Sequence, residues 1–280
     1  MDLIDFILNI AAVLLWIDWR SGRVVARGPT RAGISIANSL RATEKSRLRG
    51  WGSLGALILL LFVRSYFYAV LGSNSSWTPR IDLVAISIPW RTDLPLRMLA
   101  YSLLSFGSFL GIYYSWLLLL SIVHRDSGEN DVVHRFVELQ LGWLTRLPWV
   151  LKLVLPLACT GLAWAAISPL LRYWQMIPAP KNSAHVWEQA ALFCVAGLLL
   201  WEWLLIAFFA IHLLNLYVYL GSHPFWRYVS QTASTFLIPL KWLRFGKIDI
   251  SPLVGALLVF WVSERVIAPF VFNAFQRLPL

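Results

Sequence analysis

Hydrophobic residues occur in six long runs, each near the length that crosses a bilayer. A spanning helix needs about 20 apolar residues, or fewer when flanking side chains reach the interface. The runs are 3–19, 51–71, 94–123, 150–171, 188–220 and 252–272. The first is the weakest, because it is short and contains Asp5 and Asn9. The pattern predicts an all-α, polytopic membrane helix bundle with about six transmembrane helices, or five if the first run does not span.

Amphipathic segments lie between the runs of each pair. In residues 224–240 the apolar positions share one helical face, opposite Arg227, Ser230, Gln231 and Ser234. Residues 129–147 have the same pattern, and residues 34–48 have a weaker version. Such helices lie flat at the headgroups. We therefore predict three repeats of helix, amphipathic loop and helix, over 1–71, 95–171 and 189–275.

Composition supports lipid as the solvent of these helices. The chain has 280 residues, of which 59% are hydrophobic and 14% charged, whereas soluble domains carry about 25% charged residues. The 16 Trp residues fit the preference of indole for the membrane interface. The amino terminus, with Asp2 and Asp5, lacks the basic region of a signal peptide, so we expect the first run to be retained.

The net charge of +10 is distributed unequally along the chain. Most of the 24 Lys and Arg residues lie in the three amphipathic loops or at their borders. The positive-inside rule places these loops in the cytoplasm and both termini outside. The expected partners are membrane lipids with anionic headgroups, and membrane proteins or further copies of the chain. A nucleic-acid partner is not expected.

One segment resembles a known family. Residues 236–254 read FLIPLKWLRFGKIDISPLV, with a proline, a basic residue and Asp-x-Ser-Pro opening a hydrophobic helix. This resembles the signature of the YggT/YlmG family of small membrane proteins, over about residues 205–275. The resemblance implies that five residues occupy the family's characteristic positions: Pro239, Lys241, Asp249, Ser251 and Pro252. It also implies a bacterial cytoplasmic (inner) membrane and a role in membrane organisation. The first two repeats match only in architecture.

The Asp-x-Ser-Pro segment also has a direct physical interpretation. Asp249 and Ser251 can accept hydrogen bonds from the free N–H groups of the last helix, and Pro252 suits its first turn. The segment is then a start signal for a membrane helix. The alternative is a docking or ion-contact point.

Four ionisable residues fall inside apolar runs: Arg64, Glu202, Glu264 and Arg265. Each such charge costs about 2.5–3.5 kcal/mol on the insertion scale, so we expect each to find a partner. We predict that Glu202 or Glu264 pairs with one of the two arginines. The alternatives are a polar path for ions or protons, and side chains that reach the outer interface. His212 lies nearer the predicted cytoplasmic end of its run.

No catalytic or cofactor motif is present. The two cysteines form no disulfide or metal pattern, and His212 alone cannot supply paired haem ligands. We therefore expect no enzymatic activity and no cofactor. The leading hypothesis is an integral membrane scaffold or assembly factor with a basic cytoplasmic face. The alternative is a small ion transporter or channel in which Glu202, Glu264 and Arg265 converge on a hydrated cavity.

Overall fold

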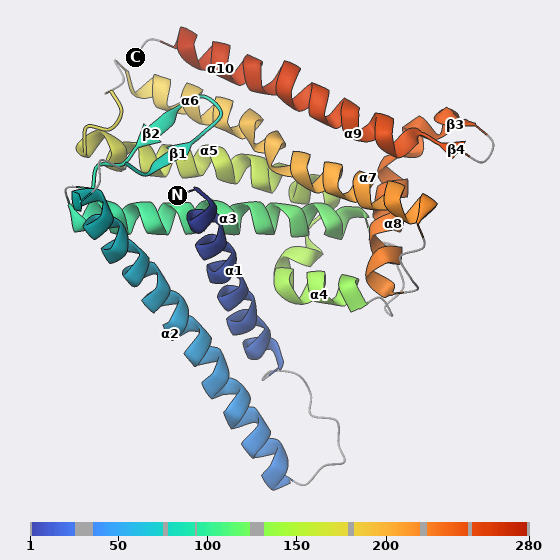
Figure 1. Ribbon diagram of the computed structural model, residues 1–280, viewed down its shortest axis with the longest axis horizontal. Coiled ribbons are helices and arrows are strands. Elements are labelled where there is room, and N and C mark those ends of the chain that lie inside the picture. The colour runs from blue at the N-terminus through green and yellow to red at the C-terminus, as the bar shows by residue number, and fades with distance from the viewer. Residues whose placement is uncertain are drawn as a thin grey trace. The chain divides into compact units, whose positions relative to one another are not determined.

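The computed structural model (Figure 1) describes residues 2–25, 36–74, 78–92, 94–123, 132–178, 182–218, 223–245 and 248–278. These residues are almost entirely helical. Five helical segments are long and apolar enough to cross a membrane: Trp51–Gly72, Pro95–Val123, Trp149–Tyr173, Ala184–Tyr217 and Ser251–Arg277. The prediction of a polytopic helical bundle is confirmed. The first helix, α1 (Asp2–Val25), is not among the five segments.

The chain divides into two compact units. The first comprises Met1–Ile81 and Pro89–Gly111, and the second comprises Asp82–Ile88 and Ile112–Leu280. Between the first two long spans, β1 (Arg80–Asp82) and β2 (Ser87–Pro89) form a two-stranded sheet. The division into three repeats along the sequence stays a prediction.

The first unit contains α1, α2 (Ile36–Asn74) and the beginning of α3 (Pro95–Val123). Its apolar core includes Leu57 and Leu61 of α2 and Phe106 of α3. The prediction of a separate interfacial helix at 34–48 is wrong for residues 36–48. These residues begin α2 and continue without a break into its apolar span. Residues 34 and 35 lie outside the described part of the chain.

Arg64 of α2 is the centre of a buried polar cluster in the first unit. It forms an ion pair with Asp5 of α1. Its Nη1 donates a 2.7 Å hydrogen bond to Asn9 Oδ1, and its Nη2 donates to Ser105 Oγ of α3 at 2.9 Å. The Arg64 side chain is 1% exposed. A guanidinium carries five N–H donors, and two neighbouring helices, α1 and α3, supply acceptors for its two terminal nitrogens.

Two tyrosines complete this cluster. The hydroxyl groups of Tyr68 and Tyr101 donate to the two Asp5 carboxylate oxygens at 2.7 and 3.2 Å. The Arg64 guanidinium carbon lies 5.5 and 5.8 Å from their ring centroids, within cation–π range. We call these six residues the Arg64 cluster: Asp5, Asn9, Arg64, Tyr68, Tyr101 and Ser105. The partner of Arg64 is therefore Asp5, and the expected pairing with Glu202 or Glu264 is wrong for this arginine.

The second unit is built on close packing of α5 (Trp149–Tyr173) with α6 (Ser183–Ala196). Thr160 Oγ1 donates a 2.9 Å hydrogen bond to the Phe193 carbonyl across this contact. Gly161 brings the two backbones together. A Cβ at this position would lie 2.5 Å from the Ala190 carbonyl oxygen and 2.3 Å from Cys194 Sγ.

Two spans of the second unit are interrupted where they meet. The 3₁₀ segment η2 (Gly197–Trp201) separates α6 from α7 (Glu202–Tyr217). The π-helical segment η4 (Ser263–Ile267) separates α9 (Ser251–Val262) from α10 (Ala268–Arg277), and the two segments are in contact. The indole N–H of Trp116 on α3 donates to the Leu200 carbonyl at 2.5 Å. This bond satisfies a carbonyl at the interruption.

The two amphipathic segments of the second unit form short helices, as predicted. They are α4 (Val132–Leu141), followed by η1 (Gly142–Arg146), and α8 (Pro224–Phe236), followed by η3 (Ile238–Leu243). Strands β3 (Arg244–Phe245) and β4 (Ile248–Asp249) then lead into α9. Val137, Val229 and Ala233 are at most 1% exposed within one core with residues of α3 and α7. Figure 1 shows α8 running across the direction of α7 and α9.

Substitution of Gly161 tests the α5–α6 contact. Gly161→Ala should lower the midpoint of thermal unfolding, because overpacking of this kind costs about 1–3 kcal/mol. Gly111→Ala is the control, since a Cβ there meets nothing within 4 Å and alanine favours a helix by about 0.5–1 kcal/mol. Thermal unfolding in lipid nanodiscs measures both variants. Equal stability of the two would contradict the proposed close contact.

Substitution of Arg64 tests the polar cluster. Arg64→Met should destabilise the chain by about 3–5 kcal/mol, because Asp5 would keep an uncompensated charge in a poorly hydrated site. The double variant Arg64→Met, Asp5→Asn should lose less, since it removes both charges. Arg80→Ala, at an exposed position, is the control. Unfolding in nanodiscs is the measurement, and a double variant less stable than Arg64→Met would contradict the pairing.

Candidate functional site

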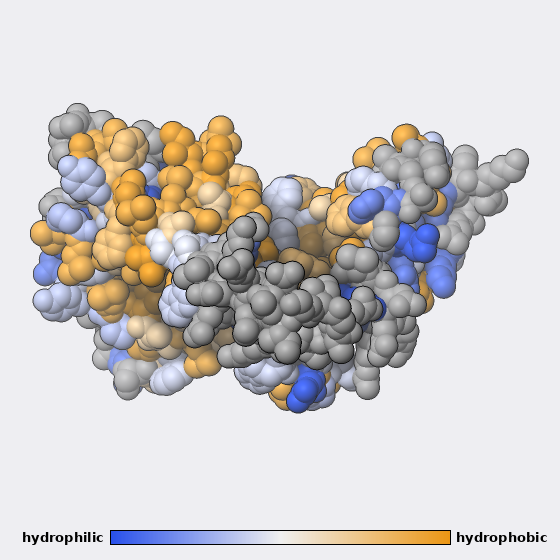
Figure 2. All heavy atoms as spheres, turned by 90° about the horizontal axis from the view of Figure 1, so that it is seen from below, coloured by the Kyte–Doolittle hydropathy of each residue, from blue (hydrophilic) through white to orange (hydrophobic). Residues whose placement is uncertain are grey.

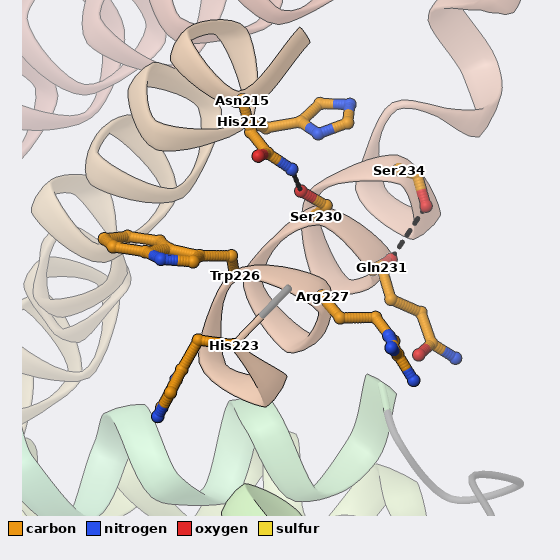
Figure 3. A pocket seen from close by; sticks show the side chains of 8 residues that line it. All are labelled: His212, Asn215, His223, Trp226, Arg227, Ser230, Gln231 and Ser234. Carbon is orange, nitrogen blue, oxygen red and sulfur yellow. Dashed lines mark hydrogen bonds between the residues drawn. The ribbon is translucent and has the colours of Figure 1, made fainter. Parts of the chain in front are cut away.

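A cavity of about 500 Å³ lies between the end of α7 and the polar face of α8. Figure 3 shows Asn215 of α7 extending to Ser230 of α8, with Nδ2 and Oγ joined by a 2.9 Å hydrogen bond. Arg227 and Gln231 lie together on one side of α8. We call this cavity the α8 pocket. Its lining residues are His212, Asn215, His223, Trp226, Arg227, Ser230, Gln231 and Ser234.

The amphipathic pattern of α8 positions this lining. His223 precedes Pro224 at the start of the helix, and its Nδ1 accepts a 3.2 Å hydrogen bond from the Phe225 backbone N–H. Proline suits the first helical turn because an N–H there has no intrahelical acceptor. On the opposite face, Val229 and Ala233 are fully buried. Burial of the apolar face therefore leaves the polar residues of α8 directed at the cavity.

A second basic cavity, of about 380 Å³, lies where α3 ends and α5 begins. Lys152, in the first turn of α5, is 7% exposed and donates a 2.7 Å hydrogen bond from Nζ to Ser121 Oγ of α3. Arg146 and Trp149 also line the cavity. We call it the Lys152 pocket. Its lining residues are Ser121, Ile122, Thr145, Arg146, Leu147, Pro148, Trp149 and Lys152.

Both pockets combine the same chemical groups. Each has at least one cation, a tryptophan and hydroxyl groups, and neither lining includes a carboxylate. Guanidinium and ammonium groups bind phosphate by charge-assisted hydrogen bonds, and tryptophan favours the headgroup level. Within the described residues, no group of three or more His, Cys, Asp or Glu could hold a metal ion. The lining chemistry suits a phosphate-containing headgroup.

The surface around α8 agrees with this chemistry. Figure 2 shows hydrophilic residues gathered at the end of the second unit that carries α8, β3 and β4. Elsewhere in the same view, hydrophobic residues predominate. By the charge distribution along the chain, this end is the predicted cytoplasmic side. Both pockets therefore lie on the side where the sequence predicts contact with anionic lipid.

The residues of the family-like segment occupy η3 and the start of α9. Pro239 and Lys241 are exposed on η3, whereas Asp249, Ser251 and Pro252 are buried. Asp249 Oδ1 accepts a 3.0 Å hydrogen bond from the Ser251 backbone N–H and another from the Ser251 hydroxyl. Asp249 thus satisfies a free N–H group at the beginning of α9, as the sequence predicts, whereas the Ser251 hydroxyl is a donor to Asp249 and not the predicted acceptor.

The charged residues Glu202, Glu264 and Arg265 of the last two spans line neither of the two described pockets. Glu202 is buried at the start of α7, beside Ser263 of η4. Glu264 and Arg265, which follow Ser263, are both exposed. None of the three lines the α8 pocket or the Lys152 pocket. His212, by contrast, is 7% exposed and lines the α8 pocket.

The structure also assigns positions to residues that the sequence did not single out. Lys152 lies in the wall of a pocket, although its sequence position indicated only a basic loop border. Asp5 and Asn9 interrupt the apolar pattern of the first run, and both bind Arg64. Their spacing of four residues places both on one helical face, and this could have predicted that they share a partner.

Comparison of the chain with models of protein families, with curated proteins and with solved structures finds no match. The resemblance of residues 236–254 to the YggT/YlmG signature is therefore not tested by these comparisons. What the structure itself supports is a polytopic membrane protein with two basic pockets on one predicted side.

Proposed function

We propose that the chain is an integral membrane scaffold or assembly factor of YggT-like type, which binds anionic phospholipid headgroups on its cytoplasmic face and presents that face to partner proteins. The observation that carries the proposal is the pair of basic pockets without carboxylates, both beside tryptophan. Basic pockets between membrane helices on the cytoplasmic side are a common form of anionic lipid site.

The proposal includes α1 as a sixth membrane helix. Asp5 of α1 pairs with Arg64, and Asp18 of the same helix accepts a hydrogen bond from Ser53 of α2. These contacts run in opposite directions along the two helices, so α1 and α2 are antiparallel. An antiparallel first helix agrees with the predicted outside location of the amino terminus.

Lipid binding can be measured on the intact chain. Purified protein in mild detergent should retain phosphatidylglycerol or cardiolipin in preference to phosphatidylcholine in native mass spectrometry. Arg227→Ala and Lys152→Met should each weaken this preference about five-fold, because one cation near an anionic surface contributes about 1 kcal/mol. Each substitution removes one proposed phosphate-binding group from one pocket.

Arg277→Ala is the matched control for this measurement. Arg277 is exposed like Arg227. It lies at the carboxyl end of the last span, whereas Arg227 precedes the amino end of that span. Its substitution should leave the lipid preference unchanged. Equal effects of Arg227→Ala and Arg277→Ala would show that net charge alone governs binding, and the proposal of specific pockets would fail.

A transporter is the second candidate, favoured by one observation. Two adjacent spans are interrupted at η2 and η4, with Glu202 between them, and discontinuous helices often form ion sites in transporters. Against this, Glu264 and Arg265 are exposed and line neither described pocket. Trp116 also already supplies a donor to the Leu200 carbonyl. We therefore favour structural packing as the role of the interruptions.

Flux measurements separate the two functions. Vesicles that contain the wild-type chain, Glu202→Gln or Glu264→Gln should conduct protons and alkali cations at the same low rate as protein-free vesicles. Fluorescence assays with a pH-sensitive dye and an imposed potential are suitable. A wild-type flux that disappears in Glu202→Gln or Glu264→Gln would replace the scaffold proposal with the transporter.

A further inference from the structure

The last span, Ser251–Arg277, is covered on only one side by the described part of the second unit. Its α9 part packs on α7, and its α10 part packs on α6. Gly255 faces this contact, since a Cβ there would lie 3.2 Å from the Phe209 ring. Val271 and Phe275 are also buried. The outward side chains include Leu257, Leu258, Phe260, Trp261, Val266 and Phe270.

Two charges interrupt this outward apolar face. Glu264 and Arg265 are exposed, whereas the preceding Ser263 is buried beside Glu202. Ser263, Glu264 and Arg265 belong to the π-helical segment η4. An extra residue in a helical turn changes the direction of the side chains that follow it, and such π-bulges are frequent at functional sites. Here, Ser263 lies on the side of the helix that packs on the second unit, and Glu264 and Arg265 lie on the outward side.

The depth of these charges excludes ordinary lipid contact. Glu264 is midway along Ser251–Arg277, about 20 Å from either end at 1.5 Å per residue. The whole hydrocarbon layer is about 30 Å thick, so both residues lie near its centre. Neither side chain can reach the headgroups from that depth, and a charge in hydrocarbon is strongly unfavourable. The outward face therefore requires a protein cover that offers opposite charges.

The second unit itself does not supply this cover in its described part. No ion pair joins Glu264 or Arg265 to another described residue. Glu202, the acidic group near Glu264, has the same charge sign and cannot neutralise it. Adjacent residues in a helix also do not face each other, so Glu264 and Arg265 cannot form a good pair within one chain.

A second copy of the chain has the required charges. In a twofold dimer with its axis along the membrane normal, residues of equal depth lie opposite each other. Glu264 and Arg265 differ in depth by about 1.5 Å, so each Glu264 can pair with the other copy's Arg265. The face carries one positive and one negative charge at the same level and is therefore self-complementary. An anionic headgroup or a singly charged partner would leave one charge unpaired.

We infer that the outward face of α9, η4 and α10 is the interface of a homodimer, joined by two reciprocal ion pairs between Glu264 and Arg265. The surrounding apolar residues, with Trp261 one turn before Glu264, form the rest of the contact. Two pairs in hydrocarbon satisfy four charges that would otherwise face lipid. This inference does not depend on the lipid pockets.

Cysteine cross-linking in native membranes tests the interface. The starting chain carries Cys159→Ala and Cys194→Ala, which remove the two free cysteines. Trp261→Cys in this chain should form a disulfide-linked dimer on oxidation. Leu162→Cys on α5 is the matched control, because Leu162 and Trp261 are both 59% exposed within spans. Absence of a Trp261→Cys dimer, or equal cross-linking of the control, would overturn the inference.

Charge substitutions then test the ion pairs. Glu264→Arg or Arg265→Glu should each lower the cross-linked fraction about ten-fold or more, because like charges would meet at the interface. The double swap Glu264→Arg, Arg265→Glu should restore cross-linking, since it keeps one charge of each sign at the same depth. Glu188→Arg, at an exposed position near the start of the span at 184–217, is the charge-reversal control.

The double swap also separates folding from association. It carries the same charges through the membrane as the wild-type chain, so a failure to insert cannot explain loss of the dimer in the single variants once the swap recovers it. Co-expression of differently tagged Glu264→Arg and Arg265→Glu chains should likewise yield mixed dimers. A cross-linked product whose mass identifies another protein, or a swap that stays monomeric in nanodiscs, would overturn the homodimer.

Discussion

Hydrocarbon offers no hydrogen bonds, and this constraint accounts for the main polar contacts of the bundle. Every charge or open carbonyl within a span must find its partner in protein. Arg64 takes its acceptors from α1 and α3, with Asp5 as counter-ion. The Leu200 carbonyl at the η2 interruption receives the Trp116 indole N–H. Lys152, buried near the start of α5, donates to Ser121. In each case the partner comes from a neighbouring helix, so satisfaction of a polar group also fixes helix packing.

Because of the same constraint, an exposed charge within a span is more unfavourable than a buried charge that has a partner. In a soluble protein an exposed ion pair is ordinary, and a buried one is expensive. In this chain the buried Arg64 is paired with Asp5, whereas Glu264 and Arg265 are exposed on the outward face near the middle of the last span. A missing partner is therefore indicated for Glu264 and Arg265, but not for Arg64. At the predicted cytoplasmic end, where water is available, the exposed Arg227 needs no such partner and is free to bind phosphate.

The amphipathic helix α8 connects the fold with the proposed function. Its buried face, which includes Val229 and Ala233, attaches it to the core of the second unit. The opposite face then lines a cavity with polar residues of α7. A helix held in this way presents a fixed set of donors on the predicted cytoplasmic side. That arrangement suits recognition of a lipid headgroup, and the described residues provide no comparable support for a conducting path at Glu202.

Properties that depend on length and local periodicity could be predicted from the sequence. Apolar runs of about 20 residues specify candidate spans, and the spacing of apolar residues around Arg227 specifies an amphipathic helix. The Asp249–Ser251 contact was also predictable, because it joins residues two positions apart. Which charges meet, by contrast, depends on how the helices pack. Asp5 and Arg64 are 59 residues apart, and their pairing depends on α1 and α2 lying antiparallel. The inward direction of Ser263 and the outward direction of Glu264 depend on which side of the last span packs on the neighbouring helices, and hydropathy does not reveal this. The Lys152 pocket likewise exists only because the end of α3 packs beside the start of α5.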